Sequence, residues 1–370
     1  MNTIDRRNWL RTVGLGGGFT LLGGLPALAD TAIPRQISST GPIKLSSNEN
    51  PYGPSARVRE VIKQNFDNAC RYPFSFLRGL VDMIAEKEGV SKDHVVVTGG
   101  STEGLKACGL VFGLHNKEVV AADPTFQALL RYAENFGSTV HRVPLNETMH
   151  HDLEAMGKKI NKNTGLVFIC NPNNPTGTLL DSSDLIDFCN TYEKDTVIFS
   201  DEAYYDFIME PDYPSMITLV KEGKNVVVSK TFSKVYGLAG LRIGYLIARP
   251  DIATRLKNSI MAMSNVLAIE AAKEALRDDE FYKYSLLQNT KAKELIYSTL
   301  DKLNLPYIKS HNNFIFFKSG RSIHELIPAM REEGVLIGRP FPPKLDWARI
   351  STGTLEETEL FNRALTKVLG

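Results

Sequence analysis

Two lysines near the middle of the chain have surroundings that could support covalent chemistry. Lys230 and Lys234 follow an apolar run and stand among small and hydroxyl-bearing residues. A lysine beside a buried strand can lose its hydration, which lowers the pKa and leaves a neutral amine that acts as a nucleophile or a base. Lys230 directly follows the strand and is interpreted as a surface lysine. The sequence therefore favours Lys234 as the reactive amine.

A carboxylate and a row of amides follow two other apolar runs. Asp201 comes directly after Val197–Ser200, and a carboxylate at the end of a buried strand needs a cationic partner, unless it only caps a helix. The segment Asn171–Gly177 follows a run that ends at Cys170. Its prolines and glycine predict a rigid turn at the carboxyl edge of a sheet, where open α/β sheets bind ligands.

The segment Gly99–Glu103 predicts a strand-to-helix turn with an anion site. Small residues and the hydroxyls of Ser101 and Thr102 stand where a helix would begin. Free backbone N–H groups at a helix start bind phosphate. A simple capped helix, with Ser101 as the cap, is the alternative for this segment taken alone.

The elements that position these residues are short apolar strands that alternate with helices. Runs of β-branched and apolar residues are typical of strands covered on both faces, and the spacing leaves room for a helix between them. We therefore expect an α/β domain with a large, mostly parallel seven-stranded sheet. The expected strands are 95–98, 119–122, 139–143, 166–169, 196–200, 226–229 and 243–247.

The C-terminal third predicts a smaller α+β domain. One long helix is expected over 268–303, followed by short strands near 307–310, 314–317, 335–337 and 348–351, with helices over 322–333 and from 356. The predicted organisation is a signal segment at 1–29, an N-terminal arm at 30–70, a large domain at 71–265 and a small domain at 266–370.

The motifs together resemble the fold-type-I pyridoxal-phosphate aminotransferases of class I/II, and most closely the histidinol-phosphate aminotransferase group. The resemblance runs from about Ile43 to the C-terminus and keeps the order of the motifs. Besides the segments above, it rests on Leu45–Pro54, Arg71-Tyr72-Pro73, Asp123-Pro124-Thr125-Phe126 and Ala348–Thr354. It implies pyridoxal 5'-phosphate as the cofactor.

The resemblance implies a role for each residue around the cofactor ring. Lys234 would form an imine with the cofactor aldehyde and then act as the base that moves the substrate's α-proton. Asp201 would pair with the protonated pyridine nitrogen and keep the ring electron-withdrawing. Asn174 and Tyr204 would bind the phenolic oxygen, and Phe126 would stack on the ring.

The same resemblance implies residues for the phosphate and the substrate. The phosphate would lie against Ser101 and Thr102, with Thr231, Ser233 and Arg242 around it. The residues expected to bind the substrate are Arg349 at its α-carboxylate, Arg339 at its distal group, and Asn174 and Tyr52 in the pocket. Tyr72 would reach the phosphate of a neighbouring subunit, which implies a homodimer with shared active sites.

The resemblance leaves several functions open. The leading hypothesis is a transaminase that moves an amino group from an amino acid or an amine phosphate to a 2-oxo acid. Its donor would be histidinol phosphate or an aromatic or dicarboxylic amino acid. The run Pro340-Phe341-Pro342-Pro343 after Arg339 departs from the pattern expected of the biosynthetic enzymes. A decarboxylase or lyase of the same fold and a non-catalytic binding module are the alternatives.

The N-terminus predicts export. Arg6 and Arg7 precede an uncharged stretch, Thr12–Ala29, that ends in Ala27-Leu28-Ala29. A basic start, an apolar run and a small-x-small ending describe a cleavable signal, and the paired arginines resemble a twin-arginine signal. We therefore expect a periplasmic or exported protein without stable membrane insertion after cleavage. An uncleaved membrane anchor and a cytoplasmic location are the alternatives.

Composition excludes other classes. The 43 Lys+Arg nearly balance 42 Asp+Glu, which argues against a nucleic-acid binder. The 43% apolar content is that of a folded globular protein. The 4 cysteines are scattered, so neither a disulfide framework nor a metal site is expected. The neighbours His150 and His151 are interpreted as a solvated pair.

Overall fold

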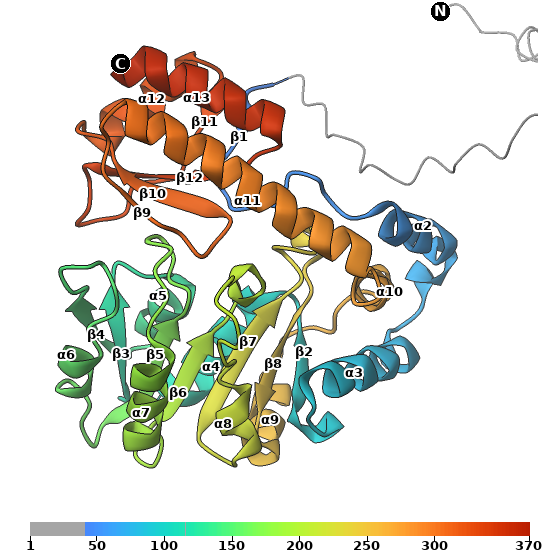
Figure 1. Cartoon of the computed structure of the whole chain (residues 1–370). Helices are drawn as coiled ribbons and strands as arrows, with labels where there is room; N and C mark the ends of the chain where they lie inside the picture. Colours follow the sequence, from blue (N-terminus) through green and yellow to red (C-terminus); the bar gives the residue numbers. More distant parts are fainter. Residues whose placement is uncertain (1–40, 115) are drawn as a thin grey trace, which may run out of the picture. The chain divides into compact units, whose positions relative to one another are not determined.

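The computed structural model describes residues 41–370, residue 115 excepted. The predicted signal at 1–29 lies outside the described residues. Figure 1 shows a large sheet flanked by helices, and a second group of helices and short strands next to the ends of that sheet.

The large sheet has seven strands, as the sequence predicts, in the order β2-β8-β7-β6-β5-β3-β4. All pairs are parallel except those of β8, which runs antiparallel to both of its neighbours. The strands are β2 (Val95–Thr98), β3 (Glu118–Asp123), β4 (Thr139–Pro144), β5 (Thr164–Cys170), β6 (Val197–Asp201), β7 (Val226–Thr231) and β8 (Gly244–Ala248). The central strands are buried on both faces, which explains their continuous apolar sequences.

Helices cover both faces of this sheet and enclose two apolar cores. Side chains of the first core come from α2 (Ala56–Gln64), α3 (Phe74–Glu88), α6 (Leu153–Gly157), α7 (Ser182–Tyr192), α8 (Ile217–Lys221) and α10 (Val266–Ala275). Side chains of the second core come from α4 (Ser101–Gly113), α5 (Ala128–Asn135) and α9 (Pro250–Lys257). Short 3-10 helices are η1 (Phe66–Cys70), η2 (Lys92–His94), η3 (Tyr205–Phe207) and η4 (Ala239–Leu241).

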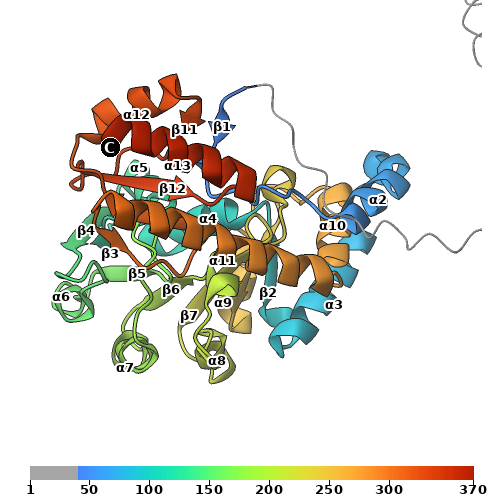
Figure 2. The same ribbon diagram turned by 45° about the horizontal axis from the view of Figure 1, so that its top comes forward.

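The smaller α+β domain has its own core, in which Leu45 joins side chains from the C-terminal third. Its strands are β9 (Tyr307–Ile308), β10 (Phe314–Lys318) and β12 (Trp347–Ser351), and β1 (Ile43–Lys44) pairs in parallel with β11 (Val335–Leu336). The helices are α11 (Asp279–Lys302), α12 (Ile323–Glu332) and α13 (Leu355–Leu369). In both views α11 and α13 lie side by side (Figures 1 and 2).

The prediction of one helix over 268–303 is wrong. The chain forms α10 and α11, because the Asp278 side chain accepts a hydrogen bond from Phe281 N and starts a new helix. Ala268, Ile269 and Ala272 of α10 are buried in the first core of the large sheet. The helix α11 contributes to both cores, since Leu286 packs against the first core of the large sheet and Ile296 belongs to the core of the small domain.

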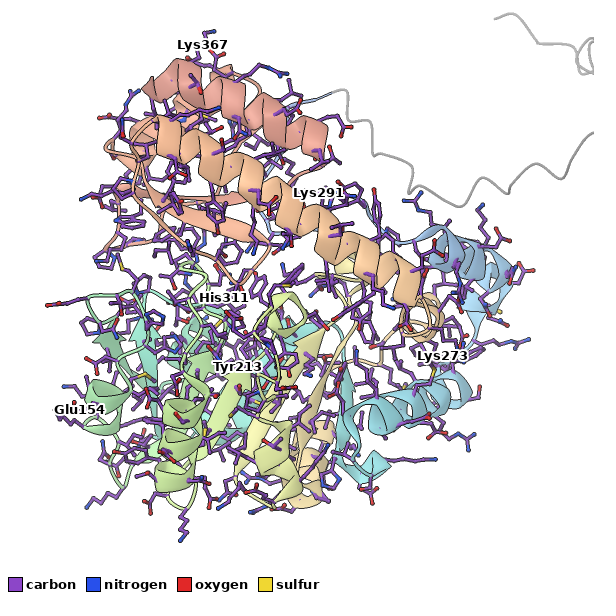
Figure 3. The ribbon with its side chains drawn as sticks, in the orientation of Figure 1. Glu154, Tyr213, Lys273, Lys291, His311 and Lys367 are labelled. Carbon is purple, nitrogen blue, oxygen red and sulfur yellow. The ribbon has the colours of Figure 1, made fainter. Side chains whose placement is uncertain are left out.

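The topology brings six chain segments to one edge of the large sheet. The parallel strands β2, β3, β5, β6 and β7 all end at that edge, and each is followed by a segment with a candidate residue. Because β8 is antiparallel, it begins there, which places Arg242 at the same edge. The small domain meets this edge, since His311 N donates to Gly177 O over 2.9 Å (Figure 3).

Candidate active site

A cavity of about 680 Å³ opens where the sheet edge meets the small domain. It collects eleven of the predicted residues from distant parts of the chain. They are Ser101, Thr102, Phe126, Asn174, Asp201, Tyr204, Ser233, Lys234, Arg242, Arg339 and Arg349. Residues that line one cavity can contact the same ligand.

Lys234 carries an amine whose pKa lies close to neutral pH. Its Nζ donates to Asn48 O over 3.1 Å and to Ser47 O over 3.4 Å. Burial lowers the pKa of Lys234 to about 8, and the charge of Arg349 adds to this effect, while Asp201 opposes it. A substantial fraction of this amine is therefore uncharged at mildly alkaline pH.

Asp201 lies at the end of β6 and is 2% exposed. Burial raises its pKa to about 7, and only the Ala203 N–H, which donates to Oδ1 over 3.2 Å, and the charge of Lys234 oppose the rise. Among the described residues no cation makes an ion pair with it. A buried carboxylate in this state is suited to a cationic ligand.

Tyr204 stands between two amides. Its hydroxyl accepts a hydrogen bond from Asn48 Nδ2 over 2.8 Å and one from Asn174 Nδ2 over 3.5 Å. Asn48 is buried, with φ of 55°, and sequence reasoning gave it no role. The signal in the sequence was the polar run Ser46–Asn50 before Pro51, which is typical of a turn. Asparagine tolerates the left-handed backbone that such a turn requires.

The start of α4 offers an anion cradle. Gly100 is the N-cap, with φ of 82°, and no side chain caps the helix, so Ser101 is the first helical residue. A Cβ at position 100 would collide with the Arg242 guanidinium, so only glycine allows this close approach. The free amides, the hydroxyls and Arg242 form a site for a dianion.

Arg349 is a second buried cation at the opposite wall. It is 7% exposed, and it donates to Asn174 Oδ1 over 2.7 Å and to Ser46 O over 2.8 Å. Its Nε has no hydrogen-bond partner, and no carboxylate of the described residues pairs with the side chain. Burial lowers the pKa of Arg349 to about 10. An incoming carboxylate would satisfy this guanidinium.

Three predicted residues do not line the cavity. Thr231 is buried, and its Oγ1 accepts from Ser233 N over 3.1 Å, so it shapes the turn before Lys234. Tyr52 packs edge-on against Tyr284, with ring centroids 5.1 Å apart, in a different small cavity. Tyr72 is 79% exposed on the surface of the chain.

Lys230 does not behave as the sequence suggested. The surface interpretation is wrong, because its side chain is 12% exposed and lies 3.3 Å from Glu88 Oε2 and 3.7 Å from Glu202 Oε2. Lys230 is therefore held in a buried ion-pair network and is not available to a ligand.

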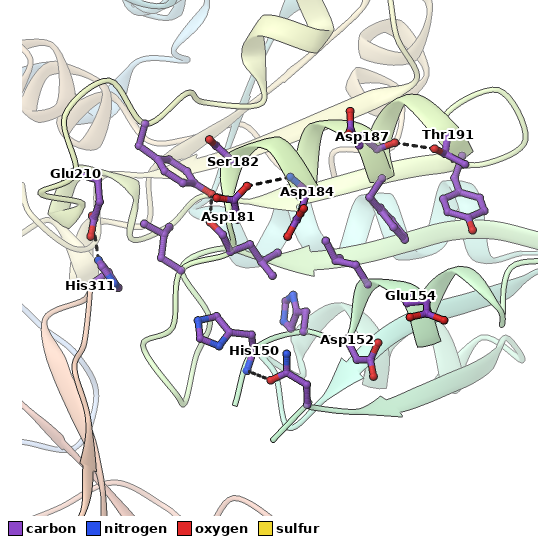
Figure 4. A pocket seen from close by; sticks show the side chains of 18 of the residues that line it. His150, Asp152, Glu154, Asp181, Ser182, Asp184, Asp187, Thr191, Glu210 and His311 are labelled. Carbon is purple, nitrogen blue, oxygen red and sulfur yellow. Dashed lines mark hydrogen bonds and ion pairs between the residues drawn. The ribbon is translucent and has the colours of Figure 1, made fainter. Parts of the chain in front are cut away.

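A larger cavity, of about 1060 Å³, lies elsewhere and has no lysine or arginine in its lining (Figure 4). Three of its carboxylates are already used, since Asp152 caps α6, Asp181 caps α7 and Glu210 pairs with His311 at 3.1 Å. His151, at its wall, is 4% exposed and burial lowers its pKa to about 4, so the prediction of a solvated histidine pair is wrong. No metal-binding group of side chains occurs among the described residues.

The residues of the first cavity fit pyridoxal 5'-phosphate. The uncapped helix start with Arg242 matches the phosphate, and the unpaired buried Asp201 matches a protonated ring nitrogen. Lys234 supplies a near-neutral amine between these two points. The three groups needed for phosphate, ring nitrogen and aldehyde therefore line one cavity.

Comparisons with known proteins agree with this fit. The aminotransferase class I and II family matches residues 40–365. Histidinol-phosphate aminotransferases from Moorella thermoacetica and Anoxybacillus flavithermus are each 35% identical, over 91% and 88% of this chain and 88% of each relative. The crystal structure of the histidinol-phosphate aminotransferase from Sinorhizobium meliloti, in complex with pyridoxal-5'-phosphate, is 25% identical, with a TM-score of 0.81 over 88% of this chain and 90% of that one.

Proposed function

Since the chain belongs to the aminotransferase class I and II family and uses pyridoxal phosphate, we propose that it transfers the amino group of histidinol phosphate, or of a similar amine phosphate, to a 2-oxo acid. The observation that carries this proposal is one cavity that holds the near-neutral Lys234, the unpaired Asp201 and the cradle at Arg242. The support for this substrate is the similarity to histidinol-phosphate aminotransferases.

When bound, the cofactor supplies an aldehyde for the amino group and a ring that withdraws electrons from the substrate. Lys234 holds and moves the proton at its Nζ, because an amine with a pKa of about 8 exchanges protons readily near neutral pH. The carbonyls of Ser47 and Asn48 orient that nitrogen. Phe126 lines the cavity as the aromatic surface for stacking.

Asp201 would bind the protonated ring nitrogen as an ionised carboxylate. The pair becomes favourable because the carboxylate is already buried and oriented by the Ala203 N–H. Tyr204 and Asn174 hold the phenolic side of the ring, and Asn48 orients Tyr204. Ser101, Thr102, Ser233 and Arg242 hold the phosphate, and Thr231 acts through the turn that presents Ser233.

Arg349 and Arg339 bind the anionic part of the substrate. Arg349 has an unpartnered Nε, and Asn174 fixes its Nη1. The match of a buried guanidinium with a carboxylate or phosphate is bidentate and strong. Asn174 therefore connects the substrate side of the cavity to the ring side.

The active unit in this proposal is a homodimer with shared sites. The described chain exposes several large apolar side chains, and the rings of two of them, Tyr72 and Phe74, lie 6.1 Å apart. The exposed side chains include Phe66, Tyr72, Phe74, Met261 and Met263. Tyr72 would act at the partner's phosphate.

Mixed subunits test this arrangement. A heterodimer of Lys234→Ala and Tyr72→Ala subunits contains one site with both residues intact, so activity should return when the two inactive proteins are mixed. No recovery, from mixtures that sedimentation shows to be heterodimeric, would remove Tyr72 from the partner's site.

The location of the enzyme is proposed to be outside the cytoplasm. The support is the Arg6-Arg7 pair and the Ala27-Leu28-Ala29 ending. No helix within 41–370, residue 115 excepted, has the length and apolarity to cross a membrane. Fractionation of cells that express the full chain, with Arg6→Lys/Arg7→Lys as a control, should place only the parent protein in the periplasm.

A donor screen tests the reaction. Purified protein loaded with the cofactor is offered 2-oxoglutarate with histidinol phosphate, phenylalanine or aspartate, and the glutamate formed is measured. We expect the highest kcat/KM with histidinol phosphate. Release of carbon dioxide without consumption of 2-oxoglutarate would instead identify a decarboxylase and overturn the proposal.

A further inference from the structure

A second, smaller cavity of about 380 Å³ adjoins the candidate active site. Arg339 lines both cavities, so one of its faces belongs to each. The smaller one is formed by the turn after β3, by α5 and by the proline-rich run after Arg339. Its charged residues are Asp123, Arg131, Arg142 and Arg339.

Arg131 and Arg339 have no acidic partner, whereas Arg142 interacts with two carboxylates. Arg142 donates from both of its terminal nitrogens to Glu134, with Nη2 at 3.0 Å, and its charge also acts on Asp123. Among the described residues, neither Arg131 nor Arg339 forms an ion pair. Burial and the charge of Arg131 both lower the pKa of Arg339, so the two guanidinium groups repel each other across the cavity.

The unpaired arginines continue a line that starts at Arg349. The guanidinium groups of Arg339 and Arg349 lie 4.3 Å and 4.9 Å from the ring centroid of Phe341. Phe341 is itself fixed by edge-on packing against Phe316, with centroids 6.0 Å apart. Three cations therefore follow one another from the wall of the active site into the smaller cavity.

We propose that Arg131 is a specificity-determining residue that, together with Arg339, binds an anionic tail on the substrate. The tail is a carboxylate or a phosphate that extends from the reacting carbon into the cavity of Arg131, Arg339 and Pro342. The proposal rests on the proposed function, because it assumes that the substrate is held at Arg349 beside Lys234.

An anion between the two guanidinium groups removes their mutual repulsion and accepts charge-assisted hydrogen bonds from both. Arg131 is exposed in the structure, so part of this gain is screened by solvent. The expected contribution is that of one charged hydrogen bond, which corresponds to about a tenfold change in affinity.

The test uses unreactive acids that bind the loaded enzyme without turnover. Dissociation constants are measured by calorimetry for glutarate, for 3-phosphonopropionate and for pentanoate, which lacks the second charge. The variants are Arg131→Gln, Arg131→Lys and the matched control Arg142→Gln, whose guanidinium lines the same cavity but is already paired with Glu134.

We expect Arg131→Gln to weaken glutarate or 3-phosphonopropionate about tenfold and pentanoate less than about twofold. Arg131→Lys should recover most of the loss, because it keeps the charge. A larger loss for the phosphonate assigns a phosphate tail, and a larger loss for glutarate assigns a carboxylate tail. Equal losses in Arg131→Gln and Arg142→Gln, or an equal loss for pentanoate, would overturn the proposal.

The failure of this proposal is distinct from that of the proposed function. Cofactor loading and glutamate formation are measured first on the parent protein. If both occur while Arg131→Gln binds all three acids normally, only the role of Arg131 is lost.

Discussion

Lys230 and Lys234, at the end of β7, lie only four positions apart but have different surroundings. Lys230 lies in a network with Glu88 and Glu202, and its ammonium group stands 4.3 Å from the ring centroid of Tyr205. Burial lowers the pKa of Lys230, but the charges of Glu202, Glu88 and Asp206 raise it, and the net shift is upward. This lysine is a fixed cation.

Lys234 meets the same burial without a carboxylate in contact. Its Nζ donates to two backbone carbonyls, and burial with Arg349 lowers its pKa to about 8. The neighbours Asp201 and Glu202 divide in the same way. Glu202 accepts from Ser215 and Met216 N, whereas Asp201 is left with one backbone N–H.

The charges around Lys230 are matched within the chain, whereas those around Lys234 are left for a ligand. Successive residues of a strand point to opposite faces, so Asp201 and Glu202 enter different surroundings. The Lys230–Glu202 side stabilises the fold, and the Lys234–Asp201 side is left uncompensated until a cofactor arrives.

The largest contrast is expected between the two lysines. Lys234→Ala should lower turnover by at least about 10⁴-fold, because it removes the amine that handles the proton. Lys230→Met should keep turnover per folded molecule and lower the free energy of unfolding by about 3–5 kcal/mol, because Glu88 and Glu202 lose their cation. Steady-state kinetics and urea unfolding measure both. Comparable loss of turnover in the two variants would show that Lys230 also takes part in the chemistry.

The two carboxylates should also differ in the size of their effects on stability and turnover. Burial raises the pKa of Asp201 from 3.8 to about 7 in the cofactor-free chain, so its ionisation disfavours folding above pH 7, and this cost disappears as the pH falls toward 3.8. Asp201→Asn should therefore stabilise the cofactor-free protein at pH 8 by on the order of 4 kcal/mol. It should also lower turnover of the loaded enzyme about 10²- to 10³-fold, through loss of the pair with the ring nitrogen.

Glu202→Gln is the matched control for that experiment. It removes a partner of Lys230, but burial also raises the pKa of Glu202, so the two effects on stability oppose each other. The change in stability at pH 8 should therefore be smaller than that of Asp201→Asn, with turnover little changed. Urea unfolding of cofactor-free protein at pH 5 and pH 8 gives the sign. Destabilisation by Asp201→Asn at pH 8 would show that Asp201 is paired within the chain.

Much of this division was accessible from the sequence, and its limits have a physical cause. The apolar runs predicted all seven strands of the large sheet, and the polar segments after them predicted the edge where Asn174, Asp201 and Lys234 meet. A strand buried on both faces has a local signature, and so does a turn at its end.

Contacts between distant segments have no such signature. Lys230 is buried because Glu88 arrives from α3, 142 positions away, which local sequence does not reveal. Asn48 reaches Tyr204 across 156 positions for the same reason. The break between α10 and α11 was missed because Asp278 acts as a cap inside a stretch of strong helix formers.

The pH dependence of cofactor capture should follow Lys234 alone. With a pKa lowered from 10.5 to about 8, the amine is mostly charged below pH 8 and mostly neutral above it. The rate of capture by cofactor-free protein should therefore rise about tenfold per pH unit below 8 and level off above it. Stopped-flow absorbance measures the profile.

Arg349→Met sharpens this measurement. The charge of Arg349 helps to lower the pKa of Lys234, so its removal should move the midpoint to higher pH. Lys230→Met, which changes a charge at the far side, should leave the midpoint in place. A shift in the second variant and none in the first would contradict the separation of the two regions.

The smallest effects are expected from the two tyrosines. Tyr204→Phe removes a hydroxyl that accepts hydrogen bonds from Asn48 and Asn174, and it should lower turnover about 3- to 10-fold with one hydrogen bond's worth of binding lost at the ring. Tyr205→Phe keeps the ring over Lys230 and loses only the bond to Tyr213 O at 2.7 Å. It should cost about 0.5–1.5 kcal/mol in unfolding and leave turnover unchanged, because Tyr205 does not line the cavity of Lys234. Turnover lost equally in both variants would mean that the network around Lys230 also supports the chemistry, and the two regions would then be one.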